Sequence, residues 1–182
     1  AALKQLDHLN LSLSNVRSLA PLSSLDNLRS LDVSFVDTLS DLRPLSRILT
    51  LEVLDLTQTP KVEDISSLAG LTSLRELTLD STKVKTLKPL ARLASLEMLS
   101  VQDTAVAELA PVSGLGALRH LDIRGSKVRS IAPLAQLKAL QFVYLSKTEV
   151  RDLSPLEKLS ELLILNLPEA ASRTAVPNIQ RA

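Results

Sequence analysis

The chain of 182 residues contains no cysteine and no tryptophan, and aromatic residues make up only 2% of it. The absence of cysteine excludes disulfides, thiolate metal sites and a cysteine nucleophile. Because apolar residues still make up 45% of the chain, aliphatic side chains, chiefly leucine, must fill its interior. Only four glycines occur, and they form no phosphate-binding loop. Thiol and nucleotide chemistry therefore find no support in the sequence.

Neither sign of charge is in excess, since 21 lysines and arginines stand against 20 acidic residues. This balance gives no long-range field that would draw the chain onto phosphate backbones, so nucleic acid is not an expected partner. Basic residues such as Lys83, Lys127 and Arg129 are interleaved with acidic ones and lack an aromatic stacking platform. No run approaches the roughly 20 apolar residues that cross a bilayer. Membrane insertion is therefore not expected.

What the sequence does contain is a leucine pattern that recurs along nearly its whole length. The segment Leu74-Arg-Glu-Leu77-Thr-Leu79 opens one copy, and the pattern restarts at intervals of 22 or 23 residues. The two longer copies carry an extra residue, one at Pro60 and the other within residues 35–38. Seven full repeats begin at residues 6, 28, 51, 74, 96, 118 and 140, and a partial eighth begins at residue 162.

Each repeat has the pattern of one strand followed by one short helical turn. Leu77 and Leu79 alternate with Thr78, which is the period of a strand with its leucines facing inward. The later Pro-Leu-x-x-Leu segment, as at residues 89–93, is typical of a helical or 3₁₀ turn with proline at its start. We predict an α/β-type repeat solenoid over residues 1–167, a curved arc with a concave parallel sheet and short helical or 3₁₀ segments on its convex side. Residues 168–182 are predicted to be a tail or linker.

This pattern resembles the leucine-rich-repeat family, specifically its 22-residue class, which includes the bacterial internalins. The resemblance covers Leu6 to Leu167. One position departs from the family, which usually has Asn in the turn after the strand. Here hydroxyl residues occupy it: Ser14, Thr59, Thr82, Thr104, Ser126 and Thr148. Because a hydroxyl has fewer donors than an amide, we expect the same fold with a weaker polar ladder.

The resemblance implies protein–protein recognition by the concave face. It also implies that the chain is the partner-selecting part of a larger bacterial effector, virulence or surface protein, secreted or delivered to a host cell. Neither end shows a recognisable cap, so we expect the natural protein to continue on both sides. An intracellular signalling scaffold and a purely structural spacer between domains are the alternatives.

The residues that alternate with the strand leucines predict the contact area. Both histidines, the single methionine, the single tyrosine and one of the two phenylalanines occur at these outward positions. Exposed aromatic, Met and Arg side chains are typical of binding hot spots, and eight strands span about 34 Å. The predicted partner-binding residues are Met98, His120, Asp122, Arg124, Phe142, Tyr144 and Ile164. The alternative is that these residues cover the C-terminal end of the sheet or contact a further repeat.

Acidic residues occupy the same face nearer the N-terminus: Asp32, Asp55, Glu76 and Asp80. This acidic patch is either a contact for a basic partner or a solvated polar surface. No further ligands converge on it, so we expect no metal site. His120 and Asp122 lack a positioned nucleophile, so we expect no enzyme here, and any catalytic domain would lie outside this chain. We also expect no cofactor and no small-molecule ligand. Phe35, beside the extra residue of the second repeat, is expected to plug the core.

Overall fold

The computed structural model describes residues 3–167. Eight strands of three residues each form one parallel sheet, in which the order of the strands follows the chain. The strands are β1 (His8–Asn10), β2 (Ser30–Asp32), β3 (Val53–Asp55), β4 (Glu76–Thr78), β5 (Met98–Ser100), β6 (His120–Asp122), β7 (Phe142–Tyr144) and β8 (Ile164–Asn166). The tail or linker expected at residues 168–182 lies outside the described residues.

A 3₁₀ helix lies between each pair of successive strands. The helices are η1 (Ala20–Ser24), η2 (Arg43–Arg47), η3 (Ser66–Leu68), η4 (Lys88–Leu90), η5 (Ala110–Val112), η6 (Ala132–Gln136) and η7 (Ser154–Leu156). All except η3 have proline in one of their first two positions, where the missing N–H has no partner to lose. The predicted 3₁₀ segments are therefore present.

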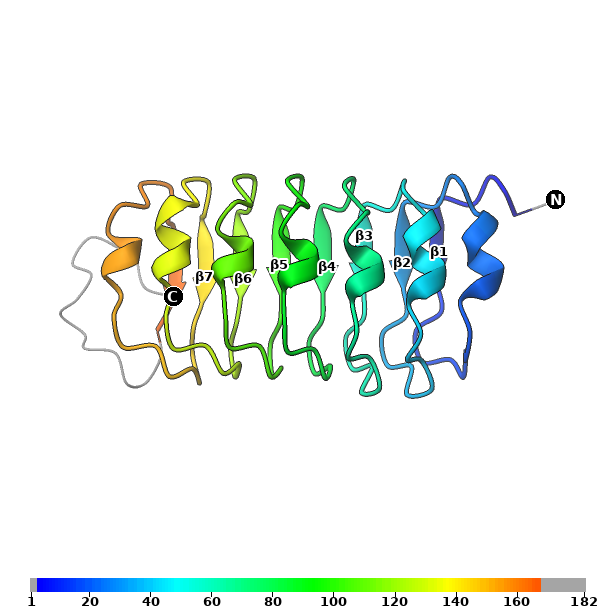
Figure 1. Ribbon diagram of the computed structural model, residues 1–182, viewed down its shortest axis with the longest axis horizontal. Coiled ribbons are helices and arrows are strands. Elements are labelled where there is room, and N and C mark those ends of the chain that lie inside the picture. The colour runs from blue at the N-terminus through cyan, green and yellow to red at the C-terminus, as the bar shows by residue number, and fades with distance from the viewer. Residues whose placement is uncertain (1–2, 168–182) are drawn as a thin grey trace.

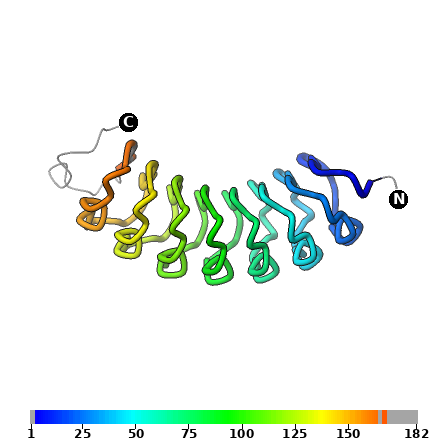
Figure 2. Tube along the Cα trace, turned by 90° about the horizontal axis from the view of Figure 1, so that it is seen from above, coloured from blue at the N-terminus to red at the C-terminus, as the bar shows by residue number. Residues whose placement is uncertain are grey.

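The strands and the 3₁₀ helices form two layers of a shallow arc. Figure 1 shows the helices in one layer in front of the sheet. Seen from above in Figure 2, the chain curves with the strands on its inner side and the helices on its outer side. The pairing joins equivalent positions of successive repeats, as in Leu31 to Leu54 and Leu54 to Leu77. The predicted curved solenoid with a concave parallel sheet is confirmed.

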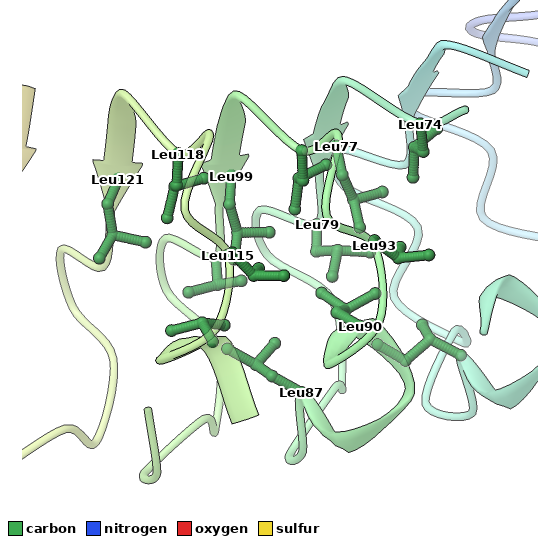
Figure 3. Packing of buried hydrophobic residues seen from close by; sticks show 14 of the residues in the cluster. Leu74, Leu77, Leu79, Leu87, Leu90, Leu93, Leu99, Leu115, Leu118 and Leu121 are labelled. Carbon is green, nitrogen blue, oxygen red and sulfur yellow. The ribbon is translucent and has the colours of Figure 1, made fainter. Parts of the chain in front are cut away.

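The core between the two layers is almost wholly aliphatic. Leu77 and Leu79 of the strand side and Leu90 and Leu93 of the helix side are all 0% exposed, and the same positions are buried in the neighbouring repeats (Figure 3). Burying one such leucine contributes about 1.5–3 kcal/mol. Since each repeat covers the leucines of the next, the stack continues one core along its length. The strands therefore rest on one continuous core.

The strand exit has the same backbone conformation in all seven full repeats. Counting from the first leucine of each repeat, the eighth residue has a positive φ between 51° and 66°. These residues are Leu13, Phe35, Gln58, Ser81, Asp103, Gly125 and Lys147. Only one of them is glycine, although this region of conformation disfavours side chains with a Cβ atom. The turn therefore imposes its shape on residues that do not prefer it.

The hydroxyl residues at the ninth position do not form the ladder between repeats that the sequence suggested. The hydroxyl of Thr82 donates to the carbonyl oxygen of Leu79, three residues earlier in its own repeat, at 2.6 Å. Thr59, Thr104 and Thr148 make the equivalent bond at 2.6–2.7 Å. Backbone bonds join some of these turns instead, as from the N–H of Lys83 to the oxygen of Val62 at 2.9 Å. In these four repeats a hydroxyl suffices because its bond closes the turn locally.

The expectation that Phe35 plugs the core is wrong. Phe35 is 45% exposed, and its positive φ lies at the strand exit. The next residue, Val36, is 0% exposed and fills the interior at the position where other repeats carry a hydroxyl. The extra residue of this repeat lies between Val36 and Leu39, which are both buried. Only one of the two neighbours can face inward at this turn, and it is the valine.

A column of alternating charges follows the second position of the repeats. It consists of Asp7, Arg29, Glu52, Arg75, Glu97 and Arg119. Within it, Arg29 pairs with Glu52, and Arg75 pairs with Glu97. Exposed ion pairs of this kind contribute at most about 1 kcal/mol each. Because the charges alternate in sign, opposite charges meet between consecutive repeats, whereas like charges would meet if a repeat packed against the next but one. The alternation therefore favours the packing of consecutive repeats.

Candidate functional site

The third position of each repeat places a row of side chains across the concave face. In this row Met98 pairs with His120, His120 with Phe142 and Phe142 with Ile164 on adjacent strands. The rings of His120 and Phe142 stack with their centroids 4.4 Å apart and an angle of 6° between their planes. His120 is exposed, and Met98 and Phe142 are half-buried. We call Met98, His120 and Phe142 the stacked row.

A second group lies beside the stacked row, at the fifth and seventh positions. The carboxylate of Asp122 accepts hydrogen bonds from Nε of Arg124 at 2.9 Å to both of its oxygens and a further bond from Nη2. This bond raises the pKa of the Arg124 guanidinium above its usual value. The Cζ atom of Arg124 lies 5.3 Å from the centroid of the Tyr144 ring, which is the geometry of a cation–π contact. Asp122 therefore orients Arg124 against Tyr144.

The structure brings the predicted partner-binding residues together. Asp122 pairs in register with Tyr144, and His120 and Phe142 begin the same two strands. The side chain of Arg124, two residues after the end of β6, remains 42% exposed, whereas that of Asp122 is 15% exposed. Ile164 stands in register on β8, and its strand position is all that the structure describes of it. Apart from Ile164, the set forms one continuous area across β5 to β7.

The acidic patch lies on the same face, toward β2. Asp32 and Asp55 are paired in register, and Glu76 is paired with Met98, so the patch reaches the stacked row. Asp80 is half-buried and accepts bonds from the hydroxyl of Ser100 at 2.5 Å and the N–H of Gln102 at 2.8 Å. Burial raises the pKa of Asp80, and the charges of Asp122 and Asp55 add to this effect. The carboxylates therefore influence one another electrostatically.

Several of these carboxylates also have a structural role that the pattern of the sequence did not predict. The Oδ1 atoms of Asp32 and Asp55 accept the N–H two residues later, at 2.8 Å in both cases, and Asp122 does the same at 3.0 Å. Asn10 makes the equivalent bond at 2.8 Å in the first repeat. The recurrence of Asp or Asn two residues before the turn was the available signal, because both side chains cap turns in this way.

The surface between the turns has shallow depressions and an ion pair. Shallow depressions of about 490 and 380 Å³ lie between the turns of the fifth to seventh repeats and are lined by Arg129, Ser130 and Glu149, among others. Arg129 and Glu149 pair with each other there at 2.9 Å. Across residues 3–167, no three His, Cys, Asp or Glu residues gather in a way that suits a metal ion. Among the helices described here, none has the length and apolar character to cross a bilayer.

The comparisons with solved structures agree with this architecture. The chain is 30% identical to internalin C2 of Listeria monocytogenes, with a TM-score of 0.84, and the match covers 93% of this chain and 74% of that one. A second internalin of the same organism, inlF, is 24% identical with a TM-score of 0.83, over 98% of this chain and 63% of that one.

A plant protein shares the fold at lower identity. The ectodomain of the Arabidopsis thaliana receptor kinase GASSHO1/SCHENGEN3, solved in complex with CASPARIAN STRIP INTEGRITY FACTOR 2, is 18% identical with a TM-score of 0.83. The match covers 98% of this chain and 24% of the ectodomain. A search of curated protein sequences gives no match. The family model described as a leucine-rich repeat region matches residues 27–176. The chain therefore belongs to the leucine-rich-repeat family.

Proposed function

We propose that this chain is a protein-recognition module and that its contact area lies on the concave face over β5 to β8. The contact residues are Met98, His120, Asp122, Arg124, Phe142, Tyr144 and Ile164. The observation that carries the proposal is the accessible stack of His120 on Phe142 beside the Arg124–Tyr144 contact. Aromatic, methionine and arginine side chains of this kind dominate the free energy of many protein interfaces.

The arrangement of these groups before binding supports the same function. His120 and Phe142 already stack, and Asp122 already holds Arg124. These side chains would therefore lose little conformational entropy when a partner binds. Loss of side-chain entropy is a main cost of association. The strands that carry the groups rest on the continuous leucine core, so the surface is rigid as well as ordered. Both features suit the recognition of a partner.

The family adds a biological context to the proposal. Leucine-rich-repeat folds typically bind proteins and are typically non-catalytic, and the internalin C2 likeness extends over most of this chain. We infer that the chain selects the partner of a larger bacterial effector, virulence or surface protein that is secreted or delivered to a host cell. An intracellular signalling scaffold would use the same surface. A purely structural spacer would not.

Affinity capture with a triple variant tests the proposal. The variant carries Met98→Ala, Phe142→Ala and Tyr144→Ser, and captured proteins from host and native lysates are compared with those held by the original chain. Circular dichroism and thermal melting establish that both remain folded. We expect at least one protein that the original holds and the variant loses.

The matched control removes apolar surface elsewhere. Leu13→Ala, Phe35→Ala and Leu49→Ala delete exposed side chains that are 79%, 45% and 59% accessible and lie off the proposed contact area. This control should keep the partner. Equal capture by the test variant and the original would move the contact area elsewhere, and the absence of any specific partner would favour the spacer.

A further inference from the structure

We propose that the segment held on the concave face is basic, with lysine or arginine side chains next to an apolar one. This inference rests on the proposed function and names the chemistry of the partner. The apolar side chain would lie on the stacked row of Met98, His120 and Phe142. The cationic side chains would lie over the acidic patch, toward β3.

The distribution of charge over the molecule is the first argument. The outward positions of the concave face are the third, fifth and seventh of each repeat. They hold five acidic residues and one of the 21 lysines and arginines: Asp32, Asp55, Glu76, Asp80, Asp122 and Arg124. The rest of the chain consequently has an excess of five basic residues, although the whole chain is nearly neutral. The concave face therefore attracts cations, and the curvature of the arc concentrates that attraction.

The capping of these turns does not require a charged side chain. Asp55 caps its turn by accepting the N–H of Thr57, and Asn10 performs the same task for Ser12 with an uncharged amide. In the eighth repeat, the amide oxygen of Asn166 accepts the N–H of Ser146 in the neighbouring repeat. Because asparagine meets the structural requirement in this chain, the negative charge of the aspartates remains for another role.

The residues of the acidic patch form no ion pair with other described residues, although the charge of Arg124 acts on Asp80. Among residues 3–167, Asp122 pairs with Arg124, and none of the ion pairs includes Asp32, Asp55, Glu76 or Asp80. Asp80 is moreover half-buried, with Asp55 and Asp122 close enough to disfavour its charge. A cationic side chain of a partner would relieve this repulsion. Polar complementarity of this kind sets specificity and the rate of association.

The stacked row lies next to the acidic patch, and this determines which types of residue the partner segment must contain. Glu76 pairs in register with Met98, so the acidic patch and the stacked row meet at β4 and β5. Neighbouring strands are about 4.8 Å apart, so a cationic and an apolar side chain a few residues apart can reach both surfaces. A purely basic or a purely apolar segment would use only half of the face.

Selection from a displayed library of random 12-residue peptides tests this inference. We expect enriched peptides to carry Lys or Arg close to Leu, Met, Phe or Trp. Fluorescence anisotropy then compares the most enriched peptide with its Lys/Arg→Gln form. The variant Asp55→Asn with Asp80→Asn keeps both hydrogen-bond acceptors and removes two charges. It should bind the basic peptide about tenfold more weakly, the size of a lost charge contact.

The control variant removes the same charge elsewhere. Asp26→Asn with Glu157→Gln changes two exposed residues off the concave face and should bind as the original does. Enrichment of neutral or acidic peptides whose binding needs Met98 and Phe142 but not Asp55 and Asp80 would overturn this inference and leave the proposed function standing. Peptides that need neither pair would overturn both. An unenriched library would overturn the basic-segment inference alone.

Discussion

At the scale of single residues, the eighth position of the repeat shows how strongly the stack governs its parts. Gly125 has φ of 66°, and a Cβ atom added there would lie 2.0 Å from Oδ1 of Asp103. The same turn in other repeats accepts residues such as Gln58 and Lys147 at similar φ. We expect Gly125→Ala to lower the free energy of unfolding by about 1 kcal/mol, the usual cost of a left-handed alanine.

The double variant separates the two contributions to that loss. Asp103→Ala removes the side chain that the new Cβ atom would meet, so Gly125→Ala should cost less in that background if the clash contributes. Urea denaturation of the four proteins in the cycle measures the difference. A loss of several kcal/mol in both backgrounds would contradict the interpretation that this turn tolerates a side chain.

Inward residues of the strands behave differently, and Leu121 provides the clearest test. Leu121 is 0% exposed in the middle of β6, so Leu121→Asp would bury a carboxylate without a partner. We expect a loss of about 4 kcal/mol or more, with hydrogen exchange rising in β5 and β7 as well, because the repeats stabilise one another. Thr78→Asp is the control, since Asp32, Asp55 and Asp122 occupy its position in other repeats. Equal losses from the two changes would show that the register is wrong.

At the scale of the elements, one hydroxyl bond closes the turn after the strand in four repeats, at Thr59, Thr82, Thr104 and Thr148. We expect Thr82→Val to lower the free energy of unfolding by about 1 kcal/mol, because the valine has nearly the same shape and cannot donate to the Leu79 oxygen. Val36 occupies the equivalent place in the second repeat, so Val36→Thr should gain up to about 1 kcal/mol. Thermal melting of both variants measures the predicted loss and the predicted gain in stability. Losses of the same size from both would mean that the hydroxyl has no special role.

The elements were also where prediction from sequence succeeded best and where its limits lay. The strands and 3₁₀ helices follow from leucine spacing, because only one face of each segment can be apolar, as at Leu77 and Leu79. The turns follow from local hydrogen bonding, which composition alone does not specify. For that reason Phe35 was expected in the core, where Val36 lies instead. The threonine bonds were likewise expected between repeats rather than within them.

At the scale of the whole molecule, the repeat frame fixes which side chains share a face but not how they touch. The register of the leucines placed His120 beside Phe142 and Asp122 beside Tyr144. The stacking of the rings and the orientation of Arg124 depend on rotamers, which a pattern of residue types does not determine. The capping role of the aspartates could not be predicted either, because residue type alone does not distinguish a capping aspartate from a solvated surface charge. The backbone partner of each carboxylate makes the distinction.

The partial burial of Asp80 on the concave face also makes the stability of the molecule depend on pH. Burial raises the pKa of Asp80 above its value of 3.8 in an unfolded chain, so the folded form holds this proton more tightly than the unfolded form does. Stability contributed by this group is therefore highest when it is protonated and falls as the pH rises through the folded pKa. At pH 7 the ionised Asp80 destabilises the fold relative to a neutral side chain of the same shape.

Asp80→Asn should consequently raise the Tm at pH 7, because the amide oxygen still accepts the bonds from Ser100 and Gln102 while the desolvated charge is gone. The difference in Tm should shrink as the pH falls and disappear below about 3.8, where Asp80 is protonated in both states. Calorimetry across this range measures the effect, with Asp26→Asn as an exposed control. If the variant also binds a basic peptide more weakly, the chain keeps at Asp80 a charge that costs stability and serves recognition, as binding surfaces commonly do. A lower Tm at pH 7 would mean instead that the charge strengthens its two hydrogen bonds by more than burial costs it.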